Sequence, residues 1–163
     1  MSGFANAIRI QVLQRLIWNH PFQSPLQDAV AWLSLLTTNP TNDGQIGEGA
    51  LYPIDYVEWG AARKALYYAP VSSSPPTGAT RWQGQEPGLG SISYTTADPI
   101  QWESDELTSV EQDTLIVGHG LFTSETGGSL WAWDKFEEPI PIRTENSYIF
   151  PTGEFKLVMQ GQE

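Results

Sequence analysis

The sequence of 163 residues contains no cysteine and only two histidines. Without cysteine there is no disulfide, no thiol nucleophile and no cysteine-based zinc or iron–sulfur site. Lysine and arginine are also scarce, eight against nineteen aspartates and glutamates, which gives a formal net charge of -11. Such a charge, with no basic patch to offset it, repels nucleic-acid phosphates and anionic membrane surfaces. Direct binding to nucleic acid or to a membrane is therefore not expected.

Long apolar runs are missing as well. No run approaches the roughly 18 consecutive apolar residues of a transmembrane helix. Arg9 and Arg15 interrupt the apolar N-terminal stretch, so neither a transmembrane helix nor a signal peptide is expected. The chain nevertheless has 40% hydrophobic and 12% aromatic residues, enough for a packed core. Its length predicts one domain over residues 1–163.

The acidic residues are concentrated in the second half of the chain. Residues 1–80 hold four basic and five acidic side chains, whereas residues 81–163 hold four basic and fourteen acidic ones. The two halves thus carry formal charges of -1 and -10, which predicts one strongly anionic end or face.

The first twenty residues predict an amphipathic helix. Phe4, Ile8, Val12 and Leu16 follow the i, i+4 spacing of one helix face, and His20 with the proline after it should end the helix. Ile8 and Val12 are candidate contacts with a partner, because helix and strand surfaces are the expected means of assembly.

From residue 29 onward the pattern is that of short strands. Residues 29–38 (AVAWLSLLTT) form a nearly continuous apolar run, which is typical of a strand buried on both faces. Further strand-like segments, separated by turn signals, cover residues 61–69, 91–96, 114–122, 129–136, 147–150 and 154–159. The Ser-, Pro- and Gly-rich stretch 71–90 predicts a long surface loop. The predicted fold is mainly β, an antiparallel β-sandwich of jelly-roll type over residues 29–163 preceded by one helix over residues 1–20.

Candidates for catalysis are few. A catalytic triad needs a histidine beside a nucleophile, and only His20 and His119 could serve. His20 precedes a proline at the predicted helix end, and His119 lies between two glycines in a predicted strand, so structural roles explain both. No catalytic residue is assigned, and no enzymatic activity is expected.

A group of carboxylates in the second half raises the possibility of a calcium site or a glycosidase pair: Glu103, Asp105, Glu106, Glu111 and Asp113. Neither this group nor residues 39–48 (NPTNDGQIGE) has the regular ligand spacing of a calcium loop. A solvated acidic loop is the simpler interpretation, although a weak ion site stays open. The glycines between residues 118 and 128 open no helix of the phosphate-loop pattern, so no metal and no cofactor is assigned.

The seven tryptophans divide by position. Trp32, Trp131 and Trp133 fall within strand-like runs, which favours a place in the core or in a subunit interface. Trp82 in the predicted loop and Trp102 beside the carboxylates are expected to be more exposed, and they are the further candidate partner contacts.

Several short motifs occur in a familiar order. Residues 6–8 (NAI) open the predicted helix, and residues 35–40 (LLTTNP) end the first strand. Residues 120–130 (GLFTSETGGSL) form a glycine-rich hairpin motif, the most specific of the set. Residues 148–157 (YIFPTGEFKL) are the last motif: an aromatic strand, a glycine turn and an alternating apolar strand. In this order the sequence resembles a family of small structural proteins of tailed phages, commonly labelled tail-fibre-like. The family's Tyr-x-Arg strand is matched loosely by residues 56–63.

The resemblance implies a short helix followed by a β-sandwich, and a structural role in the virion without a reaction. The leading interpretation is a capsid decoration or cement protein that binds the major capsid protein and itself, as a homotrimer. The alternative is a tail-fibre or receptor-binding component, in which Trp82 and Trp102 would stack on host glycans. A carbohydrate-binding or carbohydrate-active domain, which would need two carboxylates in one cleft, is a second alternative.

Overall fold

The computed structural model describes residues 3–4, 30–41, 55–67, 79–88, 91–103, 106, 114–142 and 147–160. This part of the chain is mainly β and contains no helix. Its strands are β1 (Gly3–Phe4), β2 (Val30–Thr38), β3 (Val57–Glu58), β4 (Lys64–Tyr67), β5 (Thr80–Gly88), β6 (Ser91–Thr96), β7 (Ile100–Trp102), β8 (Leu115–Phe122), β9 (Leu130–Pro141), β10 (Tyr148–Phe150) and β11 (Lys156–Gln160).

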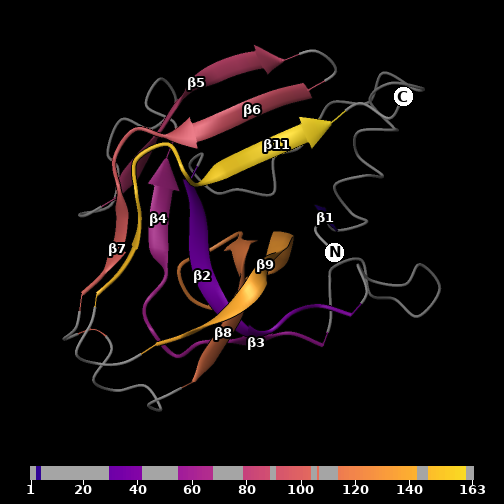
Figure 1. The fold of residues 1–163 in the computed structure, drawn as a ribbon, viewed down its shortest axis with the longest axis vertical. Helices are drawn as coiled ribbons and strands as arrows, with labels where there is room; N and C mark the ends of the chain where they lie inside the picture. The colour runs from indigo at the N-terminus through magenta and orange to yellow at the C-terminus, as the bar shows by residue number, and fades with distance from the viewer. Residues whose placement is uncertain are drawn as a thin grey trace.

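One curled sheet contains nine of these strands (Figure 1). Its order is β1-β9-β8-β2-β4-β5-β6-β11, and β3 also pairs with β2. Strands β7 and β10 form a separate two-stranded ladder. Among these strands, the pairing of β4 with β5 is parallel and the others are antiparallel. In Figure 1 the strands β5, β6 and β11 run across the picture above the upright strands β2 and β4, which shows how strongly the sheet bends.

Strand β2 lies at the centre of the sheet and is buried on both faces. It pairs with β8 on one side, where Trp32 is opposite Phe122, and with β4 on the other. Leu33 and Leu35 belong to a larger core cluster, whereas Leu36 belongs to a smaller one. Because successive side chains of a strand point to opposite faces, these two clusters lie on opposite faces of β2. The apolar run 29–38 therefore predicted both the strand and its burial correctly.

The larger core cluster joins the sheet to the β7–β10 ladder. Ile100 and Trp102 of β7 are buried in it together with Leu33, Leu35 and Leu121 of the sheet. The smaller cluster consists of Leu36, Phe122, Leu130 and Trp133. Trp131 and Trp133 are both buried, as their positions in strand-like runs predicted.

Most of the predicted strands are confirmed, and one prediction is wrong. The segments 61–69, 91–96, 114–122 and 147–150 contain β4, β6, β8 and β10, and the segments 129–136 and 154–159 overlap β9 and β11, which extend further to residues 141 and 160. Residues 80–88, however, form β5 inside the predicted loop 71–90. Strand β5 pairs with β4 and β6. Its polar, proline-containing sequence does not indicate a strand, and its backbone is held in a strand by hydrogen bonds to these two partners. Strand β7 was not predicted either, because three residues are too few to show a period.

The predicted N-terminal helix, residues 1–20, lies outside the described residues apart from Gly3 and Phe4, which form β1 and pair with Trp133 and Ala132 of β9. Within the described part of the chain, no helix is long and apolar enough to cross a membrane.

Candidate functional site

Arg63, just before β4, holds the turn between β8 and β9. Its Nη1 donates hydrogen bonds to the carbonyl oxygens of Ser124 at 2.5 Å and Gly127 at 2.7 Å. Its Nε and Nη2 donate to the two carboxylate oxygens of Glu58, at 2.8 and 2.6 Å. Every guanidinium nitrogen thus has an acceptor, and two backbone carbonyls of a distant turn are bound by one side chain.

The Arg63 side chain is only 8% exposed. Its guanidinium carbon lies 3.7 Å from the centroid of the Phe122 ring, a cation–π contact that also covers the smaller core cluster. A buried charge is stable only when it is paired and hydrogen-bonded, and Glu58 meets that requirement here. We refer to Arg63, Glu58, Phe122 and the turn residues 123–129 as the Arg63 tie.

The turn itself has a fixed geometry. The N–H of Thr123 donates to the carbonyl of Ser129 at 3.1 Å, and the N–H of Ser129 donates to Thr123 Oγ1 at 3.0 Å. Gly127 and Gly128 have φ angles of 62° and 68°, in the left-handed region that favours glycine. A Cβ atom on Gly128 would also lie 2.2 Å from Ser124 Oγ. The two glycines of the hairpin motif are therefore required by the backbone of this turn.

The motif at the end of β2 meets the hairpin motif across β8. Asn39 Nδ2 donates to the carbonyl of Val117 at 2.9 Å. A Cβ on Gly118 would lie 2.2 Å from Asn39 Oδ1, and one on Gly120 would lie 2.5 Å from Leu130 Cδ1. The residues on which the sequence resemblance rests are thus used to pack β2, β8 and β9 closely together.

His119 lies on β8 among phenylalanine rings. The centroid of its ring is 5.6 Å from that of Phe136, 5.7 Å from Phe150 and 5.0 Å from Phe155. Its Nδ1 is buried and has no hydrogen-bond partner among the described residues. Burial lowers the pKa of His119 to about 4, against the opposing effect of the Asp134 carboxylate. The ring is therefore neutral at pH 7 and is held by packing.

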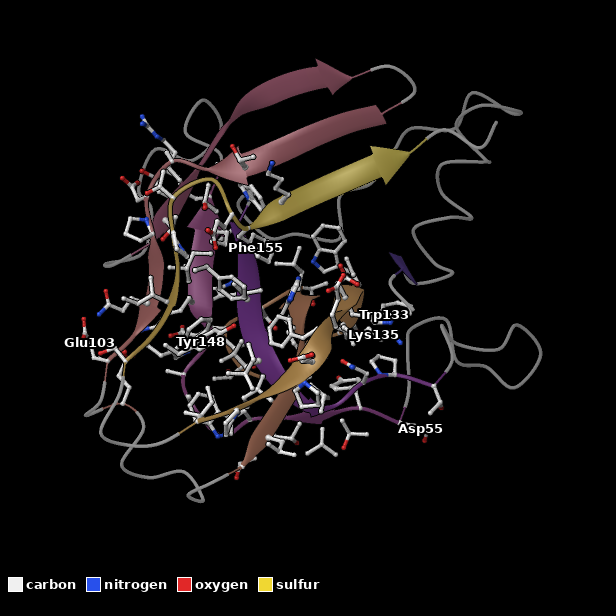
Figure 2. All side chains as sticks on the ribbon, viewed as in Figure 1. Asp55, Glu103, Trp133, Lys135, Tyr148 and Phe155 are labelled. Carbon is white, nitrogen blue, oxygen red and sulfur yellow. The ribbon has the colours of Figure 1, made fainter. Side chains whose placement is uncertain are left out.

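The aromatic cluster around His119 consists of His119, Phe136, Tyr148, Phe150 and Phe155. Tyr148 and Phe150 are 5.3 Å apart between ring centroids, and Phe150 and Phe155 are 5.5 Å apart. Burial raises the pKa of Tyr148 to about 12, so its hydroxyl stays protonated at physiological pH. Figure 2 shows Tyr148 and Phe155 over the middle of the molecule, near β2 and β4, whereas Glu103 lies at its outer edge.

The structure describes two members of the carboxylate group, Glu103 and Glu106. Both side chains accept hydrogen bonds from residues that are distant in the sequence. Lys64 Nζ donates to Glu106 Oε1 at 2.5 Å, and Glu106 Oε2 accepts the backbone N–H of Glu103 at 2.8 Å. Ser147 Oγ donates to Glu103 Oε2 at 3.2 Å. Partial burial acts to raise the pKa of Glu106, but the hydrogen bonds from Lys64 and the Glu103 backbone and the charge of Lys64 outweigh it and lower that pKa. The described residues include no group of three or more side chains that could hold a metal ion.

The candidate partner contacts lie in different places. Trp102 is 1% exposed, and its Nε1 donates to the carbonyl of Ala62 at 2.8 Å. The expectation that Trp102 is exposed was therefore wrong, because β7 directs it into the larger core cluster. Trp82 on β5 is half-buried, with its ring centroid 5.8 Å from that of Phe155. Ile8 and Val12 lie outside the described residues, as do His20, Asp105, Glu111 and Asp113.

Neither protein-family models nor curated protein sequences match the chain. The candidate site is therefore defined by its geometry alone. Its two main parts, the Arg63 tie and the aromatic cluster, connect segments that are distant in the sequence. Sequence reasoning gave Arg63 only as a loose match to a family strand and did not identify Glu58. A signal was present, because Glu58 and Arg63 stand five positions apart in a chain with few basic residues.

Large apolar side chains that remain exposed in the described part of the chain are Val57, Leu115 and Ile149, which are 54%, 51% and 45% exposed. Val57 lies on β3, Leu115 begins β8 and Ile149 lies in the middle of β10. Exposed apolar side chains are the usual means by which a surface contacts a partner, although single ones are common on any protein.

Proposed function

We propose that the protein is a non-enzymatic structural protein of a tailed-phage virion, which decorates the capsid and binds the lattice of the major capsid protein as a homotrimer. The observation that carries the proposal is the Arg63 tie, which fixes the hairpin motif that most specifically resembles the phage family. The hairpin motif uses its residues to fix the backbone of a turn. Such a structural use of a motif suits a protein whose role is to add contacts to a shell. Many modest contacts of this kind, repeated by symmetry, stabilise a shell strongly.

The finer architecture in this proposal is a β-sandwich of jelly-roll type. The bend of the sheet places β5, β6 and β11 across β2 and β4 (Figure 1), and the β7–β10 ladder shares a core cluster with the central strands. Two layers around one core are what a sandwich requires.

The positions of Trp102 and Trp82 favour the capsid over the tail. A receptor-binding tip that stacks on host glycans needs exposed aromatic faces. Trp102 is in the core and Trp82 packs on Phe155, so the aromatic residues singled out for that role are occupied by the fold. The exposed Val57, Leu115 and Ile149 are then the described side chains best suited to contact the capsid or a second copy.

The test is to mix the purified protein with capsid shells that lack it and to image the product by electron microscopy, with the mass in solution measured in parallel. We expect ordered density at symmetry positions of the shell and the mass of a trimer. Single changes of Val57, Leu115 and Ile149 to aspartate are compared with Thr152→Asp, an exposed polar position on the turn before β11. At least one of the three should weaken shell binding by roughly tenfold or more, while Thr152→Asp should not.

Absence of shell binding, together with an elongated oligomer in solution, would overturn the capsid assignment and place the protein in the tail. Shell binding that none of the three aspartate variants weakens would retain the function but exclude these side chains as its contacts.

A further inference from the structure

The C-terminal segment, residues 147–160, pairs with β7 and β6 through β10 and β11, and two of its phenylalanine rings contact β8 at one titratable side chain. Phe150 of β10 and Phe155, just before β11, both contact the ring of His119 on β8. Phe136 contacts the same ring from β9, a strand that pairs with β8. Three phenyl rings, one from β9 and two from residues 147–160, therefore meet on one imidazole.

The surroundings of His119 suit a neutral imidazole and not an imidazolium. Its Nδ1 is buried without a hydrogen-bond partner among the described residues. An imidazolium has an N–H on both ring nitrogens, and a buried N–H without an acceptor is costly. In water, outside the cluster, the same ring would titrate near its usual pKa of about 6.5. Protonation thus favours any state in which the cluster is open.

The charged and titratable groups on the neighbouring elements offer little compensation. Strand β2 places Leu35 opposite His119, and β9 places Asp134 opposite it. The Asp134 carboxylate favours the imidazolium, but Asp134 is exposed and burial has the larger effect. Tyr148 of β10 stays neutral, and Glu154 and Lys156 beside Phe155 are both exposed.

We propose that His119 is an acid-sensitive latch: its neutral ring holds β10 and the turn up to Phe155 against β8 and β9, and its protonation releases them while β11 stays paired with β6. The proposal goes beyond the structural role in the virion and does not depend on it. Among the contacts of the described residues, it makes this aromatic junction one that opens in mild acid.

The sign and size of the effect follow from linkage. A histidine whose pKa is lowered in the closed state favours closure fully above about pH 6.5, and this preference is lost as the pH falls from there toward about 4. Between about pH 7.5 and about pH 5, the equilibrium constant for closure should fall roughly thirtyfold.

The test is amide hydrogen exchange of the wild-type protein at these two pH values, corrected for the intrinsic pH dependence of exchange. We expect the protection of β10 and of the turn at Gly153 to fall roughly thirtyfold, while β2 and β8 change much less. His119→Phe should remove this pH response, because phenylalanine keeps the ring packing without a titratable nitrogen. His20→Gln is the matched control, since the chain has only two histidines, and it should retain the response.

Two further measurements make the test decisive. Titration of the His119 ring by NMR needs no variant, and a pKa at or above the usual value would overturn the proposal. Asp134→Asn removes the carboxylate that favours the imidazolium in the closed state, so the loss of protection at about pH 5 should be at least as large as in the wild type, and a smaller loss would overturn the proposal. Protection of β10 and of the turn at Gly153 that is equal at both pH values, or a response that persists in His119→Phe, would also overturn it. If His119→Phe does not fold, His119→Leu takes its place.

Discussion

At the scale of single residues, the polar side chains in this fold are used to bind backbone that is remote in the sequence. Arg63 reaches carbonyls 61 and 64 positions further along the chain, and Asn39 reaches one 78 positions further along. The bonds to Ser124 and Val117 are partly buried, where a carbonyl without a partner is costly, whereas the bond to Gly127 is exposed.

Arg63→Lys should therefore destabilise the protein although it preserves the charge. An ammonium cannot bind both oxygens of Glu58 in a fork and also reach the carbonyls of Ser124 and Gly127. We expect the free energy of unfolding to fall by about 2–4 kcal/mol, measured by urea denaturation. Arg81→Lys, at an exposed arginine, is the control and should change it by less than about 0.5 kcal/mol. Equal stability of the two variants would show that the Arg63 tie contributes nothing.

The two glycines of the hairpin turn provide a matched pair. Alanine at either position incurs the cost of a positive φ, about 1 kcal/mol. At Gly127 no atom lies within 4 Å of the added Cβ, whereas at Gly128 the Cβ would collide with Ser124 Oγ and Thr123 Oγ1. Thermal unfolding should therefore show a smaller loss for Gly127→Ala than for Gly128→Ala, which we expect to lose about 2–3 kcal/mol. A larger loss for Gly127→Ala would contradict this account of the turn.

At the scale of elements, the sequence predicts strands well where a strand carries its own pattern. Residues 29–38 are apolar on both sides, and residues 114–136 combine apolar runs with a glycine turn, so β2, β8 and β9 could be predicted. Strands β5 and β7 could not, because β5 is polar and contains a proline although its partner β6 follows directly, and β7 has three residues and pairs with the distant β10. In the Arg63 tie, the spacing of Glu58 and Arg63 was a usable signal for their ion pair, but the acceptors of Nη1 are backbone carbonyls that no side-chain pattern reveals.

Trp102→Phe tests whether β7 is fixed by its tryptophan. The change removes the hydrogen bond from Nε1 to the carbonyl of Ala62 and leaves a cavity in the larger core cluster. We expect a loss of about 2–4 kcal/mol in the free energy of unfolding and faster amide exchange in β10, which pairs with β7. Trp82→Phe, at a half-buried ring, should cost about half as much or less. Similar losses in both variants would argue that the two tryptophans are equally important to the core.

At the scale of the whole molecule, the order of the sheet brings together strands from both ends of the chain. Strand β2 pairs locally with β3 and β4, but its other edge pairs with β8, and β1 pairs with β9. The acidic second half therefore shares one sheet with the nearly neutral first half. Folding must close these long loops before the central pairing forms, which is typical of slowly folding β proteins.

The pairing of Trp32 with Phe122 has a consequence during synthesis. Strand β2 is complete as soon as residue 38 has left the ribosome, yet its second partner emerges only when residues 115–122 have been translated. Throughout that interval, the nascent chain carries an apolar strand with one unpaired edge, the kind of segment that aggregates or is bound by chaperones. We therefore expect the nascent chain to need chaperones most before β8 emerges, and less once β8 has paired with β2.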